Sequence, residues 1–296
     1  MQQNQASALV ENGFVRMEAL FSRAEIDDWR RVAQSTLEDL DEAHRERFRS
    51  NGSLCNLAEL PAFAPLIGDR RITGAIAELG GSDIRWTSGY LISKPPGGDP
   101  LFWHQDWWGW DEAISYDAYP TQLFVMIYLT DTRVENGCLR LIPGSHRRDH
   151  ELHGLPAAHT EEIATGVDAT DPIYASHPDE VAAAVSAGDV LIGDARLLHS
   201  AYANTTTEER PLLTLWYIPN WSSLPGSVRA TLRSIYNRHV VDIDDGVGDL
   251  PTVDHWPADA IEHVRHLLPA YDGDDRPTPW NRIPDRSRLL SAGADA

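Results

Sequence analysis

The tripeptide His104-Gln105-Asp106 is the first feature of the sequence with clear chemical potential. Residues two apart on a β-strand point to the same face, so a strand here would aim an imidazole and a carboxylate at one point. On a helix the two side chains would diverge by about 200°, because each residue turns a helix by about 100°. Two such ligands, completed by a distant histidine, form the set that binds iron(II) and leaves coordination positions open. A His-x-Asp pattern is common by chance, so other residues must support it.

The third ligand must come from a strand well downstream. The chain has 12 histidines, and His199 is favoured because it ends a segment, Gly188 to His199, that is typical of a strand, a turn and a second strand. A buried imidazole must be hydrogen-bonded or ligated. Taken alone, His199 would be interpreted as a satisfied core histidine, and the pair at 104 and 106 reverses that preference.

Arg210 follows His199 after a polar loop of residues 204–209. A hairpin folding near Thr205 would place Arg210 roughly opposite His199, one strand over. A guanidinium can bind a carboxylate through two parallel hydrogen bonds, as a dicarboxylic co-substrate would require. The alternative interpretation is a surface arginine next to two glutamates.

The segments around these residues predict the elements that must position them. Residues 1–82 are expected to be mainly helical, with a capping box at Ser22 and Glu25 and a second helix from about Asp69 to Leu79. Residues 83–220 contain short apolar runs separated by turn residues, which favour a mainly β sandwich or barrel such as a jelly roll. The expected strands are 84–92, 123–129, 138–142, 190–192 and 213–218.

The remaining segments show weaker patterns. Residues 150–185 are less regular and are expected to form an insertion or lid within the jelly-roll core. Residues 221–296 should form a helical extension, with a helix near 258–268, and a proline- and charge-rich tail whose last ten residues we expect to be disordered. We expect the whole chain, 1–296, to be a single domain.

Composition excludes several classes of partner. The chain has 296 residues, with 25 Lys and Arg against 45 Asp and Glu, for a net charge of −20. Such a chain should repel nucleic acid and anionic membrane surfaces. The sequence has two cysteines, no CxxC pair, no signal-peptide pattern and no apolar run long enough to span a bilayer, which together favour the cytoplasm.

Several motifs in the same order resemble the phytanoyl-CoA dioxygenase family over roughly residues 9–220. They are the His104 motif, NGCLRLIPGSH at 136–146, Gly188-Asp189, His199 and Arg210. The resemblance implies a double-stranded β-helix, a cupin-like jelly roll with flanking α-helices. It also implies Fe(II), 2-oxoglutarate and O₂ as cofactor and co-substrates, with ascorbate as an assay additive. His104, Asp106 and His199 match the iron ligands, and Arg210 matches the residue that binds the distal carboxylate of 2-oxoglutarate.

The resemblance implies three further contacts. Family members often carry a hydroxyl residue two places after the distal histidine, where this chain has Ala201 with Ser200 beside it. Gln122 lies on a strand where another co-substrate contact is expected. Lys94 lies at a strand end that faces the mouth in this family, so it is expected to contact co-substrate or substrate.

Aromatic residues near the motif are candidates for the substrate site. Trp108 shares parity with His104 and Asp106 and is expected to wall the pocket, with core packing as the alternative. Tyr217, at the end of a buried strand, is a second candidate. Some family members replace the aspartate by Gly or Ala and bind halide, so the presence of Asp106 favours hydroxylation over halogenation.

These observations predict a dioxygenase that hydroxylates or otherwise oxidises an unactivated C–H bond of a small molecule, in secondary or specialised metabolism. The acidic chain disfavours a CoA thioester, and an amino-acid-derived or terpenoid-like substrate is expected. Two alternatives stay open: a jelly-roll sensor or binding protein that holds a metal without catalysis, and a cupin-like isomerase or hydrolase that uses another metal. The oligomeric state is not predicted.

Overall fold

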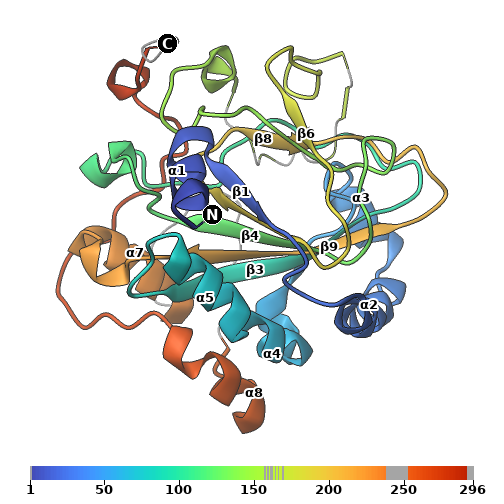
Figure 1. The fold of residues 1–296 in the computed structure, drawn as a ribbon, viewed down its shortest axis with the longest axis horizontal. Helices are drawn as coiled ribbons and strands as arrows, with labels where there is room; N and C mark the ends of the chain where they lie inside the picture. Colours follow the sequence, from blue (N-terminus) through green and yellow to red (C-terminus); the bar gives the residue numbers. More distant parts are fainter. Residues whose placement is uncertain are drawn as a thin grey trace.

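The computed structural model describes residues 2–237 and 253–291, apart from residues 157, 159, 161, 162, 164, 166 and 169. Two antiparallel sheets face each other (Figure 1). The larger sheet has the order β1 (Phe14–Met17), β7 (Val190–Asp194), β4 (Leu123–Tyr128), β9 (Arg210–Ile218), β3 (Arg85–Lys94) and β2 (Cys55–Asn56). The smaller sheet has the order β6 (Val181–Ala183), β5 (Leu139–Leu141) and β8 (His199–Ala201). From β6 onward the chain alternates between the sheets, which is the double-stranded β-helix that was predicted.

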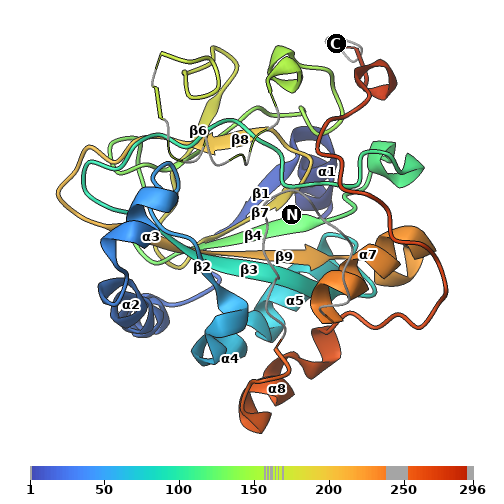
Figure 2. The same ribbon diagram turned by 180° about the vertical axis from the view of Figure 1, so that it is seen from behind.

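Helices cover the outer face of the larger sheet. Figures 1 and 2 show α4 (Ala64–Ile67), α5 (Arg70–Glu78) and α8 (Ala258–Val264) on the side away from β6 and β8. Alternate residues of the central strands, such as Val125 and Leu215, are fully buried in the cluster that these helices complete. Other α-helices of the described residues are α1 (Gln2–Asn12), α2 (Arg23–Glu38), α3 (Glu42–Arg47) and α7 (Gly226–Asn237).

The inner face of the larger sheet packs against the smaller sheet. Phe124, Met126 and Leu212 contribute to this second core together with Leu139 and Leu141 of β5. Because side chains alternate along a strand, Arg210, Thr214 and Trp216 of β9 project toward the same inner face as Leu212. Both cores therefore use the same strands, and the inner one contains the functional residues.

Most of the predicted elements are present. Ser22 caps α2 with the reciprocal bonds of a capping box, since its amide donates to Glu25 Oε2 at 2.9 Å and its hydroxyl accepts from the Glu25 amide at 3.3 Å. Asp69 caps α5 through the Arg71 amide. The five predicted strands match β3, β4, β5, β7 and β9 within a few residues. How the chain divides into domains stays a prediction.

Two expectations about strands are wrong. β1 lies in the N-terminal part, where mainly helices and no strand were expected. It pairs with β7, with Phe14 opposite Gly193. β8 and β9 do not form a hairpin, because β8 pairs with β5 in the smaller sheet while β9 pairs with β3 and β4 in the larger one. The polar loop after β8 crosses between the sheets, so Arg210 reaches the inner space from the opposite sheet.

The insertion lies beside the smaller sheet. It contributes β6 to that sheet, and its Ile173 and Tyr174 pack with Phe102 just before the His104 motif. In the part of the chain described by the structure, no helix combines the length and apolar character needed to cross a membrane.

Candidate metal centre and co-substrate site

His104, Asp106 and His199 come together in one buried cluster, with ligand atoms all within 4.8 Å of one another. The Asp106 carboxylate lies between the two histidines, 3.5 Å from His104 Nε2 and 3.6 Å from His199 Nε2. His104 does not lie in a regular strand, but it forms an isolated antiparallel bridge with His199 through two backbone hydrogen bonds of 3.0 Å. Gln105 points to the other side and donates to the Arg196 carbonyl. The predicted alternation of faces is therefore present without a full strand.

Backbone carbonyls hold one nitrogen of each histidine and turn the other toward Asp106. His104 Nδ1 lies 3.0 Å from the Phe102 carbonyl, and His199 Nδ1 lies 2.9 Å from the Leu197 carbonyl. A carbonyl accepts only from a protonated nitrogen, so each Nδ1 carries a hydrogen, and in the neutral ring Nε2 is the nitrogen that offers a lone pair to a metal. This orientation of the ring by a second hydrogen bond is the usual arrangement of metal-binding histidines.

The charge states of the cluster also suit a cation. Burial lowers the pKa of His199 to about 4, so this imidazole is neutral at pH 7. Burial opposes ionisation of Asp106, but the neighbouring His199 and His104 and a hydrogen bond from Trp216 outweigh it and hold its pKa below the usual value. Two imidazoles and one carboxylate are the ligand set of a non-haem iron site.

Trp216 fixes the Asp106 carboxylate. Its indole Nε1 donates to Asp106 Oδ2 at 2.9 Å, and its ring packs edge-on against Tyr90 with centroids 5.8 Å apart. This hydrogen bond of Trp216 to Asp106 was not predicted from the sequence. The alternation of side chains places Trp216 on the inner face, because residues 210 and 216 share a face of β9.

Arg210 is a buried cation, and two of its polar atoms lack a partner among the described residues. Its side chain is buried, and neither Nε nor Nη1 has a hydrogen-bond partner. Burial lowers the pKa of Arg210 and the ring of Tyr128 lies 5.6 Å from its guanidinium carbon. The hydroxyl of Thr214, on the same face of β9, is also buried without a partner. Leaving such groups unsatisfied is costly, so a guanidinium and a hydroxyl facing one space fit a carboxylate ligand.

The comparison with known proteins agrees with this geometry. A family model described as phytanoyl-CoA dioxygenase (PhyH) matches residues 9–212, well over half of the chain. The chain belongs to the phytanoyl-CoA dioxygenase family. One relative, an ectoine dioxygenase of Nocardia farcinica (strain IFM 10152), is 29% identical over 68% of this chain and 72% of its own length. A second, a probable alpha-ketoglutarate-dependent hypophosphite dioxygenase of Stutzerimonas stutzeri, is 24% identical over 70% of this chain and 75% of its own length.

A solved structure supports the fold. The non-heme alpha ketoglutarate dependent carbocyclase SnoK from nogalamycin biosynthesis superposes with a TM-score of 0.56, at 23% identity, over 74% of this chain and 84% of that one. At this identity the likeness shows the fold alone. With the family and the triad, the predictions of an iron- and 2-oxoglutarate-dependent oxygenase and of a jelly roll are confirmed. The reactions named for these relatives differ, so family membership does not determine the reaction.

Two of the predicted co-substrate residues already have partners within the protein. The Ser200 hydroxyl donates to the Leu101 carbonyl and accepts from Arg140 Nε at 3.0 Å. Lys94 is paired with Arg210 across β3 and β9, and its ammonium donates to the backbone carbonyls of Ser50 and Asp99. Burial lowers the pKa of this lysine. A contact of Ser200 or Lys94 with co-substrate or substrate stays a prediction.

Gln122 projects to the inner face, next to Phe124 in its alternation. Its amide donates to the hydroxyl of Thr87 at 3.3 Å, and the Phe124 ring lies 5.3 Å from that of His199. Gln122 is therefore on the metal side of the site, and its contact with co-substrate stays a prediction.

Both aromatic residues predicted for the substrate site belong to packing clusters. Tyr217 faces the outer core, where its hydroxyl donates to the Ile67 carbonyl at 2.7 Å. Trp108 stacks between Trp107 and Trp280, with ring centroids 5.2 and 4.8 Å apart. The prediction for Tyr217 is wrong because side chains alternate along β9, so Trp216 faces the inner side and Tyr217 the outer side. Trp108 packs against other tryptophans, and its contact with substrate stays a prediction.

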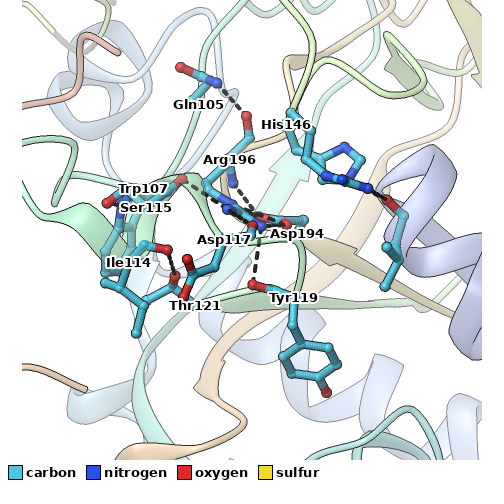
Figure 3. Close-up of polar contacts among 12 residues, drawn as sticks. Gln105, Trp107, Ile114, Ser115, Asp117, Tyr119, Thr121, His146, Asp194 and Arg196 are labelled. Carbon is cyan, nitrogen blue, oxygen red and sulfur yellow. Dashed lines mark hydrogen bonds and ion pairs between the residues drawn. The ribbon is translucent and has the colours of Figure 1, made fainter. Parts of the chain in front are cut away.

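A buried ion pair between Arg196 and Asp194 lies next to Gln105, the middle residue of the His104 motif (Figure 3). Arg196 and Asp194, both fully buried, are joined at 2.6 Å. The guanidinium of Arg196 also donates to the carbonyls of Ser115 and Asp117 at 2.8 and 2.7 Å, and its own carbonyl accepts from Gln105. The turn between β7 and β8 therefore connects one loop to the middle residue of the metal motif.

A second cluster of possible ligands lies in the insertion and comprises His150, His177 and Asp179. Here Nδ1 of each histidine accepts from a backbone amide, that of Leu152 at 3.2 Å and that of Asp179 at 3.1 Å. Each Nε2 must then carry the hydrogen, the opposite of the arrangement at the triad. His177 Nε2 accordingly pairs with Glu151 at 2.6 Å. This cluster is an ion-paired surface network and not a metal centre of the same kind.

Proposed function

We propose that the protein is a hydroxylase-type dioxygenase that converts an unactivated C–H bond of a small molecule into C–OH. The balanced reaction consumes one O₂ and one 2-oxoglutarate and releases succinate and CO₂. The observation that carries the proposal is the pairing of two features: a triad in which both histidine Nε2 atoms lie beside the Asp106 carboxylate, and a buried Arg210 without a carboxylate partner among the described residues. The presence of Asp106 supports hydroxylation over halide transfer.

Each residue has a defined task in this proposal. His104, Asp106 and His199 are the iron ligands, and Trp216 keeps the carboxylate in one orientation. Arg210 binds the distal carboxylate of 2-oxoglutarate through its unpaired Nε and Nη1, and the Thr214 hydroxyl adds a further donor. When bound, the iron supplies the oxidation chemistry, and the protein orients co-substrate and substrate around it.

The substrate proposed is a small molecule of specialised metabolism, with neither nucleic acid nor membrane as partner. The net charge of −20 supports the exclusion of polyanionic partners. Cys55 and Cys138 are both free thiols, which supports a reducing compartment, and we place the protein in the cytoplasm.

The test begins without knowledge of the substrate. Metal-free protein is titrated anaerobically with Fe(II) and then 2-oxoglutarate, and we expect a visible charge-transfer band from the chelate. Candidate amino-acid-derived and terpenoid-like molecules are then screened for succinate formation with a hydroxylated product of matching yield. His199→Ala should abolish the band and the turnover, whereas the exposed His263→Ala should retain both.

The outcomes separate the alternatives. Iron binding without a 2-oxoglutarate band would favour a metal-binding sensor. Tight binding of another divalent metal and product formation without O₂ consumption would favour a cupin-like isomerase or hydrolase. Undiminished iron affinity and turnover in His199→Ala would refute the assignment of the triad.

A further inference from the structure

The C-terminal residues 278–290, here called the C-terminal strap, pass along the loop that follows Asp106 and end beside Arg147. The backbone of Asn281 donates to the Trp108 carbonyl at 2.7 Å and accepts from the Trp110 amide at 3.2 Å. The side chain of Asn281 donates to Asp111 at 2.7 Å. The strap is far beyond residues 9–212, which the family model matches, so this contact belongs to a part of the chain outside the shared pattern.

Arg282 extends from the strap to the metal motif itself. Its Nη1 donates to the Asp106 carbonyl at 2.8 Å and reaches the Gln105 carbonyl at 3.4 Å. The guanidinium carbon lies 5.0 Å from the ring of Trp280, and that ring stacks on Trp108. A charged donor on the main-chain carbonyl of a metal ligand fixes the backbone from which the carboxylate projects.

The strap is held at both ends. On one side, Thr278 is buried, its amide donates to the Ser227 carbonyl at 3.3 Å and its carbonyl accepts from the Thr231 hydroxyl at 2.9 Å. On the other side, Leu290 exchanges two backbone hydrogen bonds of 2.8 Å with Arg147 and Asp149. Figure 1 shows this C-terminal chain, in red, leaving the helix layer and ending on the side of the smaller sheet.

Residues 104–107, which include two of the metal ligands, need contacts from other segments because strand pairing does not continue through them. His104 pairs with His199 at a single bridge, and the amides of Asp106 and Trp107 both converge on the Ala195 carbonyl. A regular strand would fix the next carbonyls through a ladder, and here Arg282 supplies a donor from the strap. The indole of Trp216 fixes the carboxylate of the same residue from β9.

We propose that Arg282 is a positioning residue of the metal centre and that the C-terminal strap is needed to hold the metal ligands in their binding geometry. Arg282 holds the main chain of Asp106 so that the carboxylate meets iron and Trp216 in one geometry. This inference rests on the proposed iron site. It assigns no substrate contact to Arg282.

The strap provides its own control. Arg286 lies a few residues further on and pairs with Asp149 at the surface, with Nε–Oδ1 and Nη2–Oδ2 distances of 2.6 and 2.9 Å, without touching the metal loop. Arg282→Met, Arg282→Lys and Arg286→Met are compared with wild type. Fe(II) affinity is measured by anaerobic titration of metal-free protein, the charge-transfer band is recorded after addition of 2-oxoglutarate, and unfolding midpoints are taken in the presence of a chelator.

Loss of an outer partner of a metal ligand weakens metal binding by roughly 10- to 100-fold. We expect that loss in Arg282→Met, with a shifted or broadened band, substantial recovery in Arg282→Lys, and wild-type values in Arg286→Met. The inference is overturned if Arg282→Met binds Fe(II) within twofold of Arg286→Met and gives the same band. It is also overturned if Arg282→Met loses metal affinity only in proportion to a lower unfolding midpoint and Arg282→Lys restores neither.

The proposed function fails by a different result. Wild type that binds Fe(II) and 2-oxoglutarate but makes no succinate with any substrate would refute the enzyme and leave the positioning role intact. Wild type that binds no Fe(II) would refute both.

Discussion

Trp216→Phe isolates one hydrogen bond at the metal centre. The substitution keeps an aromatic ring on the inner face of β9, against Tyr90, but removes the indole N–H that lies 2.9 Å from Asp106 Oδ2. A hydrogen bond to a charged group contributes about 1.5–3 kcal/mol. At about 1.4 kcal/mol per tenfold change, we expect Fe(II) affinity to fall by roughly 10- to 150-fold.

The matched control is Trp221→Phe. Trp221 is also a buried tryptophan, and its indole donates to the Ala270 carbonyl at 3.1 Å, away from the metal ligands. Both variants are titrated anaerobically with Fe(II) from pH 5 to 8. Because the Trp216 hydrogen bond favours the ionised carboxylate, its loss should also raise the pH below which iron is lost. Equal Fe(II) affinity in the two variants across this range would refute the reasoning.

Two further predictions concern buried charges. Arg210→Met should weaken 2-oxoglutarate binding by at least about 30-fold, since truncating one partner of a buried charge pair costs about 2 kcal/mol or more; calorimetry measures this loss. The same variant should be as stable as the wild type or more stable without ligand, because the guanidinium that it removes has unpaired atoms. Thermal unfolding of the ligand-free proteins checks this. The metal-free protein should lose stability as pH falls from 6.5 toward 4, by up to about 4 kcal/mol per pH unit, because the unfolded chain protonates first. Chelator-treated protein unfolded in urea at pH 7 and pH 5 tests this, and a pH-independent midpoint would contradict it. The groups responsible are three histidines whose pKa burial lowers to about 4, namely His146, His153 and His199.

A local pattern predicted His104 and Asp106, whereas the choice of His199 also needed its strand context and the resemblance to the family. Alternation along an extended chain brings His104 and Asp106 to one face, and a single bridge to His199 preserves that geometry although no regular strand forms. The capping box at Ser22 and the apolar run of β4 could also be predicted, because each depends only on neighbouring residues in the sequence.

Long-range contacts were not predictable in this way. β1 has only four residues, too few to show a recognisable strand pattern in the sequence, and its partner β7 lies far along the chain. Parity alone distinguishes Trp216 from Tyr217, and only the pairing of β9 with β3 and β4 shows which face is inner. The last ten residues, 287–296, were expected to be disordered, whereas residues 286–288 form a 3₁₀ helix and Leu290 pairs with Arg147; residues 292–296 lie outside the described residues.

Asp106 shows why the tripeptide alone does not define the site. Its amide is bound by the carbonyl of Ala195 in the turn after β7, its carboxylate by Trp216 of β9, and its carbonyl by Arg282 of the C-terminal strap. These segments are distant in sequence, and each restrains a different group of the same residue. A His-x-Asp pattern without them would keep its ligand atoms but not their fixed geometry. A change in the strap should therefore alter the metal centre without altering any ligand, because Arg282 reaches the main chain of Asp106 from outside the two sheets.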